Sequence, residues 1–430
     1  MNLMGFMIKK FIKNNEFVKN LFTLISGTAI AQIIAVLFQL IIRRVYTPAD
    51  FGAFAVYMSI VGIVATVVTL RYELAIVLPK KDKTSANVFF LSIIINLLFS
   101  LLLFIAVLVF KDRLVSLLNF PLDYSYWLFF VPLSVFLFSL YQSINYWLIR
   151  KKAYKSSSIN KIVRRTTEGA VQTGFGYIKV PFGLVIGDLL GNIANNISGL
   201  YQILKNKFKF SYINKADLIY VLKRYKEFPK YNTFPALFNS ISLLLPIILV
   251  NKFYSQTLTG YFDLSRVVLA MPLALITTSL FQVLLQHISV KKNNKQSIKK
   301  YIRNITASLF VVSLIGVAIF SLWSVDIFSF VFGENWIMSG EFTKILVFSY
   351  AIKFIVSPLS VVFTALEKIK IGSIWQFFYF CLIISLLFFK NLDIFIFLKI
   401  YVLIDLVAYS VYYILILFVS NQYEKSLLKV

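Results

Sequence analysis

The sequence predicts an all-α integral membrane protein of about twelve transmembrane helices, arranged as two pseudo-symmetric six-helix bundles around a central cavity. Hydrophobic residues make up 59% of the 430 residues, and charged residues only 14%, whereas a soluble domain carries roughly 25% charged residues. Apolar runs of about twenty residues, long enough to cross a bilayer core of roughly 30 Å, recur along the chain. Two distant segments also resemble each other, which indicates a duplicated unit.

The apolar runs give the order of the expected helices. The first six lie near residues 20–42, 52–72, 85–109, 125–149, 155–178 and 181–204. The second six lie near residues 230–250, 261–286, 302–323, 342–366, 370–389 and 393–419. The range 155–178 is the least apolar, because Arg164, Arg165 and Glu168 fall within it.

Basic clusters predict the orientation of these helices. They lie mainly in alternate connections and near the chain ends, as in "LPKKDK", "RKKAYK", "KNKFKF" and "KKNNKQSIKK". Cytoplasmic loops carry the excess of Lys and Arg, so both termini are predicted to be cytoplasmic. The first apolar run is too long for a signal-peptide core, and we interpret it as a retained helix.

A polar stretch divides the chain into residues 1–204, a cytoplasmic amphipathic linker at 205–229, and residues 230–430. An internal repeat supports the division: "VYTPADFGAF" at 45–54 aligns with "FYSQTLTGYF" at 253–262. The shared features are a tyrosine, a hydroxyl residue, a glycine and a phenylalanine, each in the turn after the first helix of a half. Halves with six spans each enter the membrane in the same sense, as in transporters with a cavity between two related lobes.

Other function classes fit the sequence poorly. The net charge of +26 lies in short clusters without a basic-aromatic groove or zinc-knuckle spacing, so no nucleic-acid partner is predicted. The single Cys381 excludes a disulfide within the chain and a four-cysteine metal site. There is no Walker A loop and no loop carboxylate pair with diphosphate-metal spacing. We therefore predict a protein that is not an enzyme and has no cofactor or metal site.

The densest set of in-span polar residues lies in "NKIVRRTTEGAVQTG". Arg164, Glu168 and Gln172 are spaced so that they share one helix face. On the following helix, one face carries Asp188, Asn192 and Asn195. Two readings stay open: an Arg–Asp pair that only joins the helices, or a polar cavity wall with spare cationic donors. A guanidinium group suits a diphosphate because its planar fork donates two bonds at once.

Further charges fall within or beside other spans, where they usually face a cavity or a partner. Arg71 and Glu73 are two residues apart, so on a helix they face different directions and each needs a partner elsewhere. Arg71 either binds substrate at the cytoplasmic mouth or pins the helix end to neighbouring carbonyls. The other such charges are Asp263, Arg266, Lys353 and Asp405.

The stretch "RRVYTPADFGAF" at 43–54 interrupts two apolar runs. Its repeat at 253–262 keeps the turn and packing residues and not the arginine pair. We therefore interpret the stretch as an architectural bend, with Asp50 as a helix cap. The alternative is that Arg43 or Arg44 contacts a diphosphate at the periplasmic exit.

The chain resembles the Wzx-type polysaccharide-repeat flippases of the multidrug/oligosaccharidyl-lipid/polysaccharide exporter superfamily. The resemblance covers essentially the whole chain. It rests on "SGTAIAQIIAVLFQLIIRRVYTPADFGAFAVY" at 26–57, "LRYELAIVLPKKDKTSA" at 70–86, "LYQSINYWLIRKKAYKSSSINKIVRR" at 140–165 and "VFGENWIMSGEF" at 331–342.

The resemblance implies a V-shaped pair of six-helix bundles around a cationic cavity, in a multi-pass protein of the bacterial inner membrane. It implies transfer of an undecaprenyl-diphosphate-linked oligosaccharide, an O-antigen or capsule repeat unit, from the cytoplasmic to the periplasmic leaflet. The expected partners are this lipid-linked substrate, membrane lipids, and the polymerase and chain-length regulator of the same pathway. The substrate-binding candidates are Arg71, Arg164, Arg165, Arg266 and Lys353. Coupling to H⁺ or Na⁺ would use Glu168, Asp188 or Asp405.

Several alternatives remain beside this interpretation. A drug/cation antiporter of the same superfamily should have a more acidic cavity than a chain with only 18 Asp and Glu residues provides. A lipid II flippase should have more spans than are predicted here. A glycan polymerase or ligase, which is an enzyme, should have long periplasmic loops. The last alternative is a scaffold without transport activity.

Overall fold

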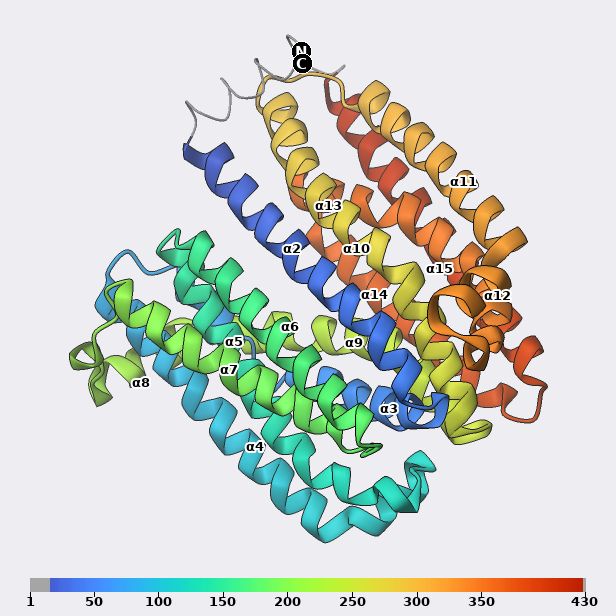
Figure 1. Ribbon diagram of the computed structural model, residues 1–430. Coiled ribbons are helices and arrows are strands. Elements are labelled where there is room, and N and C mark those ends of the chain that lie inside the picture. The colour runs from blue at the N-terminus through green and yellow to red at the C-terminus, as the bar shows by residue number, and fades with distance from the viewer. Residues whose placement is uncertain (1–15, 428–430) are drawn as a thin grey trace, which may run out of the picture. The chain divides into compact units, whose positions relative to one another are not determined.

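The computed structural model describes residues 16–427, and every regular element in that part of the chain is a helix (Figure 1). The α-helices are α2 (Glu16–Val45), α3 (Pro48–Ala65), α4 (Asp82–Leu118), α5 (Val131–Arg150), α6 (Tyr154–Tyr177), α7 (Gly183–Lys205), α8 (Lys215–Arg224), α9 (Glu227–Phe253), α10 (Gln256–Asn293), α11 (Lys299–Phe332), α12 (Ile337–Val356), α13 (Val361–Ala365), α14 (Ile369–Ile384) and α15 (Ile394–Leu427). The short 3-10 helices are η1 (Tyr72–Val77), η2 (Leu122–Phe130), η3 (Phe210–Tyr212), η4 (Glu334–Trp336), η5 (Ser357–Ser360) and η6 (Ser385–Phe389).

The predicted all-α membrane architecture is confirmed. Each of the twelve expected ranges falls on helical structure, and within residues 16–427 nine helical segments are long and apolar enough to cross a membrane. The expected spans outside those nine are α6, α7 and α10. Helices α6 and α7 carry charged and amide side chains in their middle turns, and these residues make up the polar cluster described below.

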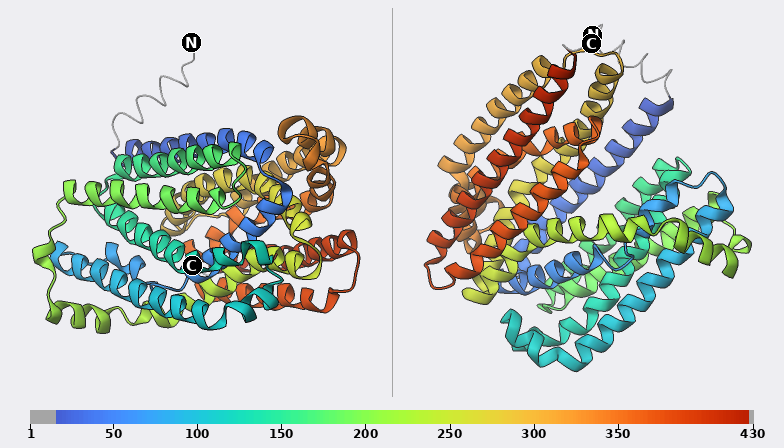
Figure 2. Two further views of the ribbon diagram at one scale, coloured as in Figure 1. Left: turned by 60° about the horizontal axis from the view of Figure 1, so that its bottom comes forward. Right: turned by 180° about the vertical axis from the view of Figure 1, so that it is seen from behind.

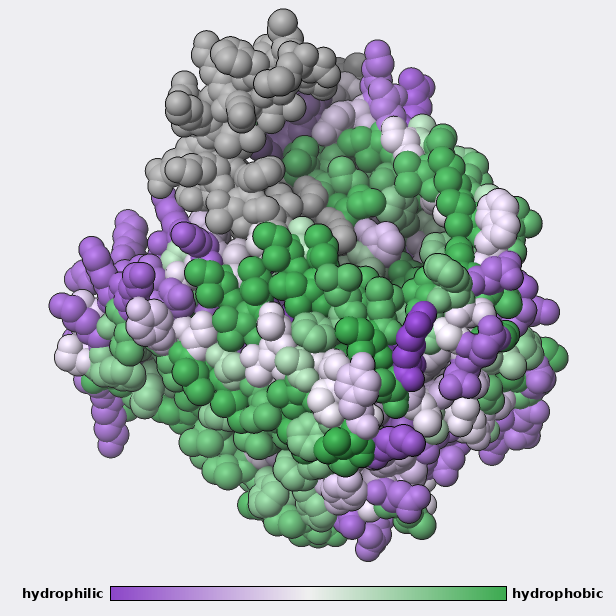
Figure 3. All heavy atoms as spheres, in the orientation of Figure 1, coloured by the Kyte–Doolittle hydropathy of each residue, from purple (hydrophilic) through white to green (hydrophobic). Residues whose placement is uncertain are grey.

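Large apolar side chains on the outside of α4 and α11 show which surfaces meet lipid. Leu102 of α4 is 65% exposed and Leu322 of α11 is 66% exposed. Figure 3 shows hydrophobic side chains covering much of one face of the molecule. Exposure of so much apolar surface is costly in water and is expected of helices that lie in hydrocarbon.

The chain forms two compact units. Unit 1 contains the chain up to Tyr46 together with Tyr57–Leu237, and unit 2 contains Thr47–Val56 together with the chain from Phe238 onward. The segment expected as a linker, 205–229, therefore belongs to unit 1, where α8 packs against α4.

In unit 1, α6 lies between α2 and α7, as the left view of Figure 2 shows. Helix α5 packs against both α4 and α7. Three buried aromatic rings fill the core near η1 and α8: Phe208 lies 5.1 Å from Phe89 and 4.8 Å from Trp147 between ring centroids. This packing ties the segment after α7 to the helix bundle.

In unit 2, α12 is the central helix and packs against α10, α11 and α15. Trp375 of α14 stacks on Tyr412 of α15 with 3.8 Å between ring centroids, and its indole nitrogen donates to the Ala408 carbonyl at 2.8 Å. The last two long helices are thereby joined by an aromatic stack.

The second expected span ends earlier than its apolar run. Helix α3 ends at Ala65, and a turn leads to η1. Leu70 and Arg71 have φ angles of 50° and 62°, a left-handed conformation that is uncommon for residues other than glycine. The expected range of 52–72 is therefore wrong at its carboxyl end, because hydropathy does not report where the backbone turns.

The two repeated segments meet within unit 2. A Cβ on Gly52 would overlap the carbonyl of Gln256, and a Cβ on Gly260 would overlap the carbonyl of Pro48. Positions 48 and 256 match in the repeat, as do 52 and 260, so the contact is reciprocal. The predicted bend is thus also a crossing point where each half needs glycine for close approach.

The hydroxyl residue shared by the repeats caps a helix in each half. Thr47 Oγ1 accepts from the Asp50 amide at 3.2 Å, and Asp50 Oδ2 accepts from the Thr47 amide at 2.8 Å. This reciprocal arrangement is a capping box. Ser255 Oγ accepts from the Leu258 amide at 3.1 Å. The expectation that Asp50 is itself the cap is wrong in position, because Thr47 is the cap and Asp50 lies in the first turn.

Candidate functional site: two buried carboxylate clusters

The polar stripe of α6 meets α7 in unit 1 at an ion-pair cluster. Arg164 lies between two acids, with its Nη2 3.4 Å from Asp188 Oδ1 and its Nε 3.9 Å from Glu168 Oε2. Arg165 Nη1 also pairs with Glu168 Oε2 at 3.0 Å. Helix spacing brings Glu168 one turn from both arginines. The sequence-predicted residues of α6 and α7 are therefore together in space.

Asp188 is 1% exposed and is held from three helices. Besides Arg164 of α6, Ser134 of α5 donates to Asp188 Oδ2 at 3.2 Å, and Asn192 of α7 donates to Oδ1 at 2.9 Å. The Ser134 hydroxyl also lies 2.7 Å from the Tyr57 hydroxyl. A buried carboxylate is costly unless it is paired and hydrogen-bonded, and these contacts meet that requirement.

The cluster on α6 and α7 carries more positive than negative charge. Lys161 lies one turn before Arg164 and donates to Thr28 Oγ1 at 2.9 Å, and no ion pair to it is found among the described residues. In the described part of α6 and α7, this stripe thus holds three cations, Lys161, Arg164 and Arg165, and two acids, Glu168 and Asp188. The Arg164 side chain is 15% exposed and lies 5.6 Å from the Phe138 ring centroid. The guanidinium is therefore partly shielded but not sealed.

A second cluster joins α12 and α15 in unit 2. Lys353 Nζ lies 2.5 Å from Asp405 Oδ2, and Asp405 is fully buried. Tyr379 of α14 donates to Asp405 Oδ1 at 2.7 Å, and Ser349 of α12 donates to Oδ2 at 2.5 Å. The predicted Lys353 and Asp405 are partners, although 52 residues separate them in the sequence.

Tyrosine rings surround the Lys353 ammonium. Its Nζ lies 5.2 Å from the centroid of Tyr350, 5.3 Å from Tyr401 and 5.7 Å from Tyr409. Ring faces attract a cation at these distances. The Lys353 side chain is only 7% exposed and already pairs with Asp405, so this ion pair is neutral and buried.

Arg266 of α10 lies near the Lys353 cluster. Its Nη2 donates to the Leu243 carbonyl of α9 at 3.0 Å, and its guanidinium lies 5.7 Å from the Phe262 ring centroid. Tyr350 and Tyr401 are among its electrostatic neighbours, together with Asp263. Unit 2 therefore brings together Arg266, Lys353 and Asp405 through shared tyrosines.

Arg71 lies in the left-handed turn before η1 in unit 1. Its Nη1 pairs with Glu73 Oε1 at 3.5 Å, and Glu73 Oε2 accepts from Thr69 at 2.5 Å. The expectation that Arg71 and Glu73 need separate partners is wrong, because the segment is a turn and a 3-10 helix instead of an α-helix. No described contact joins Arg71 to the cluster on α6 and α7.

Three of the candidate arginines share one feature. The Nε atoms of Arg71, Arg164 and Arg266 are buried and make no hydrogen bond within residues 16–427, although Arg164 Nε lies 3.9 Å from the Glu168 carboxylate. Most buried donors in folded proteins are satisfied, so each of these groups is available to an additional acceptor. An anion with several oxygens is the class of ligand that such donors suit.

The residues around these clusters were not all expected. Sequence reasoning missed Tyr57, Ser134, Ser349, Tyr379 and Tyr401. Serine and tyrosine are frequent in membrane helices, and nothing in their spacing separates them from packing residues. Within the described chain, no group of three or more His, Cys, Asp or Glu side chains could hold a metal ion.

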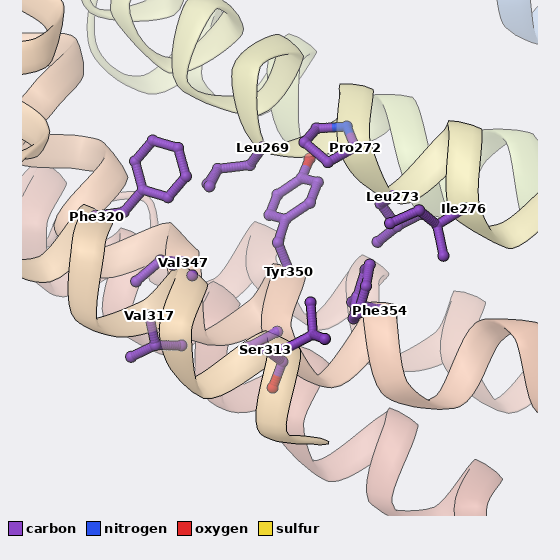
Figure 4. Close-up of a pocket in the computed structure, with 13 residues that line it drawn as sticks. Leu269, Pro272, Leu273, Ile276, Ser313, Val317, Phe320, Val347, Tyr350 and Phe354 are labelled. Atoms are coloured by element: carbon purple, nitrogen blue, oxygen red, sulfur yellow. The ribbon is translucent and has the colours of Figure 1, made fainter. Parts of the chain in front are cut away.

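An apolar cavity lies beside the Lys353 cluster in unit 2. It has a volume of about 160 Å³ and lies between α10, α11 and α12. Its walls include Leu269, Pro272, Val317 and Phe354, and Figure 4 shows Tyr350 projecting between them. The Tyr350 ring thus contacts the cavity and also faces the Lys353 ammonium.

Comparison with known proteins supplies a family and a fold. The family described as "polysaccharide biosynthesis protein" matches residues 41–341. An inward-facing MATE-family multidrug resistance transporter of the MOP superfamily has a TM-score of 0.71 at 13% identity, over 92% of this chain and 96% of that chain. The lipid II flippase MurJ, in an inward closed conformation, has a TM-score of 0.70 at 14% identity, over 94% and 90%. A MOP-superfamily transporter from Pyrococcus furiosus, described as having a binding pocket of reverse polarity, has a TM-score of 0.57 at 12% identity, over 94% and 95%. No curated protein matches the sequence.

Proposed function

Because the chain belongs to the polysaccharide biosynthesis protein family, we propose that it is a flippase for an undecaprenyl-diphosphate-linked oligosaccharide, an O-antigen or capsule repeat unit. The proposed reaction is transfer of the lipid-linked glycan from the cytoplasmic to the periplasmic leaflet of a bacterial inner membrane. No covalent bond changes in this step. The fold shared with membrane transporters and a flippase supports the proposal.

The observation that carries the proposal is that the buried Nε atoms of Arg71, Arg164 and Arg266 make no hydrogen bond within the described residues. A diphosphate crossing hydrocarbon loses its hydration and needs donors that replace water. Guanidinium donors make charge-assisted bonds to phosphate oxygens. Arg165 and Lys353 would contribute positive potential around these donors.

The mechanism we propose is an exchange of partners at Arg164. In the resting state its charge is shared between Glu168 and Asp188. Binding of H⁺ or Na⁺ at these carboxylates would release the guanidinium to a diphosphate, and loss of the ion would return it to the carboxylates. Asp405 is the corresponding acid in unit 2. Alternating access of the two lobes would then expose the head group to each side.

The hydrocarbon part of the substrate also finds a suitable surface. The cavity walls between α10, α11 and α12 are almost wholly apolar, and the hydroxyl of its one serine, Ser313, donates to the Phe310 carbonyl. A prenyl segment could fill this cavity while the head group stays near Arg266, because Tyr350 borders both. An amphiphile with an anionic head matches that arrangement.

The drug/cation antiporter alternative is disfavoured by the same contacts. A cationic drug needs an acid that is left without a cation of the protein. Asp188, Glu168 and Asp405 all pair with Arg or Lys. These three buried or half-buried acids are therefore already paired with a cation of the protein.

Glycan display in a strain that lacks this chain tests the proposal. Wild type restores surface glycan, Arg164→Ala reduces it by at least about tenfold, and Arg164→Lys gives an intermediate level because an ammonium lacks the planar fork. Arg303→Ala, an exposed arginine of α11, is the matched control and should restore glycan fully at equal protein level. If Arg164→Ala and Arg164→Lys both restore wild-type glycan, the proposed role of Arg164 is wrong.

A further inference from the structure

Helix α8 presents a surface that neither the bundle of unit 1 nor the proposed transport step uses. We call this the α8 surface. Four apolar residues on it are well exposed: Phe210 (61%), Ile219 (47%), Tyr220 (56%) and Leu222 (43%). Exposed basic residues flank them, namely Lys209, Lys215, Lys223, Arg224 and Lys226.

The segment that carries this surface is firmly attached to unit 1. Val221 is fully buried in the aromatic core. The Tyr72 hydroxyl donates to the Leu222 carbonyl at 2.9 Å, and Asn87 Nδ2 donates to the Tyr212 carbonyl at 2.8 Å. One face of α8 thus packs against the core of unit 1, and the opposite face is exposed.

The five basic residues of the α8 surface outnumber the acids beside them in the sequence, which are Asp217 and Glu227. Asp217, the acid within α8, pairs with Lys83 of α4 at 2.8 Å. Hydrogen bonds from Lys83 and from Asn214 hold the pKa of Asp217 below its ordinary value. This carboxylate is therefore paired with a residue of α4 and not with the basic residues of the α8 surface. Within the described residues, the five basic side chains of the α8 surface make no ion pair.

Chain connectivity places α8 at a membrane boundary. It follows the end of α7 and leads directly into the apolar α9. Figure 3 shows hydrophilic side chains gathered at the end of unit 1 where Figure 1 places α8, next to a hydrophobic surface. A short helix with exposed aromatic and aliphatic residues among lysines suits the boundary between head groups and acyl chains.

We propose that the α8 surface binds the anionic head groups of the leaflet that it faces, with its apolar residues inserted among the acyl chains. The basic residues supply the charge complementarity, since clustered Lys and Arg beside a span attract anionic lipids.

A spin-label experiment on the full chain tests this inference. The exposed Cys381 is changed to Ser, and Ile219→Cys carries a nitroxide in vesicles of phosphatidylcholine alone or mixed with phosphatidylglycerol. We expect the label to become more accessible to oxygen and less accessible to a water-soluble nickel complex when phosphatidylglycerol is present. High salt should reverse the change, because it screens exposed charges.

Charge reversal separates lipid binding from folding. The triple variant Lys223→Glu, Arg224→Glu and Lys226→Glu should abolish the response to phosphatidylglycerol, since each basic residue contributes roughly fivefold to membrane association. The matched control reverses three exposed lysines of another connection, Lys295, Lys299 and Lys300, and should keep the response. If the triple variant does not fold, the salt titration of the labelled chain that keeps all its basic residues still tests whether anionic lipid binds the α8 surface.

Two results overturn the inference. One is a label at position 219 that is equally exposed to water in both kinds of vesicle. The other is a label that stays exposed in anionic vesicles and becomes protected only when an acidic protein or nucleic acid is added. Neither result bears on glycan display by Arg164 variants, so the flippase proposal is tested separately.

Discussion

The Asp188 cluster of unit 1 and the Asp405 cluster of unit 2 each contain an aspartate, a serine, a cation and an aromatic ring. The cation and the ring lie on different helices in the two units. In each, an aspartate on the last long helix of its half accepts from a serine, Ser134 on α5 or Ser349 on α12. Four residues after the serine stands Phe138 in unit 1 and Lys353 in unit 2. The fifth expected span of each half supplies the other component, Arg164 in unit 1 and Tyr379 in unit 2.

The cation and the aromatic ring have therefore exchanged helices between the two halves. A buried carboxylate requires a cation and hydrogen-bond donors, but not from one particular helix. This is why sequence comparison of the halves finds the turn residues and not these clusters. Similar contacts persist where residue identity at matching positions does not.

The clusters also differ in how much charge they leave available. Arg164 has a side chain 15% exposed and belongs to a group with three cations and two acids. Lys353 is more buried and pairs one to one with Asp405. If the proposed function holds, the Arg164 cluster of unit 1 has more positive charge to offer a substrate than the Lys353–Asp405 pair, which joins α12 to α15.

Removing Asp405 should give the largest effect. Asp405→Leu leaves the Lys353 ammonium buried without its acid, and we expect a loss of about 3–5 kcal/mol in the free energy of unfolding. Adding Lys353→Leu should recover most of that loss. Thermal unfolding in detergent gives the measurement. Asp188→Leu should cost less, because Arg164 keeps Glu168; an equal or larger loss would contradict the difference drawn between the clusters.

The crossing of the repeated segments predicts equal effects in the two halves. Gly52→Ala and Gly260→Ala each place a Cβ against a backbone carbonyl of the other segment, and overpacking of this kind costs about 1–3 kcal/mol. Gly174→Ala on α6 is the control, since no atom lies within 4 Å of its added Cβ. Melting temperatures that fall for only one of the two crossing glycines would show that the contact is not reciprocal.

Transplanting the unit 2 arrangement into unit 1 tests the exchange of helices directly. Arg164→Tyr should destabilise unit 1, and adding Phe138→Lys should restore part of the loss by supplying a new cation to Asp188. A double-mutant cycle should give a favourable coupling of about 0.5–3 kcal/mol. Glycan display should not recover, because lysine lacks the guanidinium fork. Simple additivity of the two changes would count against the correspondence.

The exposed Asp217–Lys83 pair gives the smallest predicted effect and contrasts with the buried clusters. Lys83 lowers the pKa of Asp217 from its ordinary value of 3.8. When the pKa of Asp217 is lower in the folded than in the unfolded state, the Lys83 pair stabilises the packing of α8 on α4 at pH values above the unfolded-state pKa. That stabilisation is lost as the pH falls through the folded-state pKa. The protection factors of the α8 amides, each taken relative to the intrinsic exchange rate at the same pH, should therefore fall as the pH drops below about 3.8. In Asp217→Asn this pH dependence should be absent.

Much of the fold follows from the sequence, because a bilayer demands long apolar runs. Each of the twelve expected ranges overlaps helical structure. The end of α3 could not be found in this way, since the chain turns after Ala65 while the apolar residues continue. The pairing of Arg71 with Glu73 was missed for the same reason: it depends on the left-handed backbone at Arg71.

The candidate site divides similarly. Arg164 and Glu168 were predicted to share a face because helix spacing is local, and Asp188 followed on the next helix. Tyr379 and Ser349 gave no signal, because their role arises from contacts with a residue on α15. The Lys353–Asp405 pair joins spans far apart in the sequence, and no spacing rule links them.

The sequence by itself determined that this chain is a helical membrane protein with charged residues inside its spans. Only the tertiary structure decided which of those charges neutralise one another, and which arginines keep a buried Nε without a hydrogen bond in the described part of the chain. The physical reason is that pairing across helices depends on how each helix is rotated and packed against its neighbours. A hydropathy run and a helical repeat determine which residues share a face, but not what that face meets.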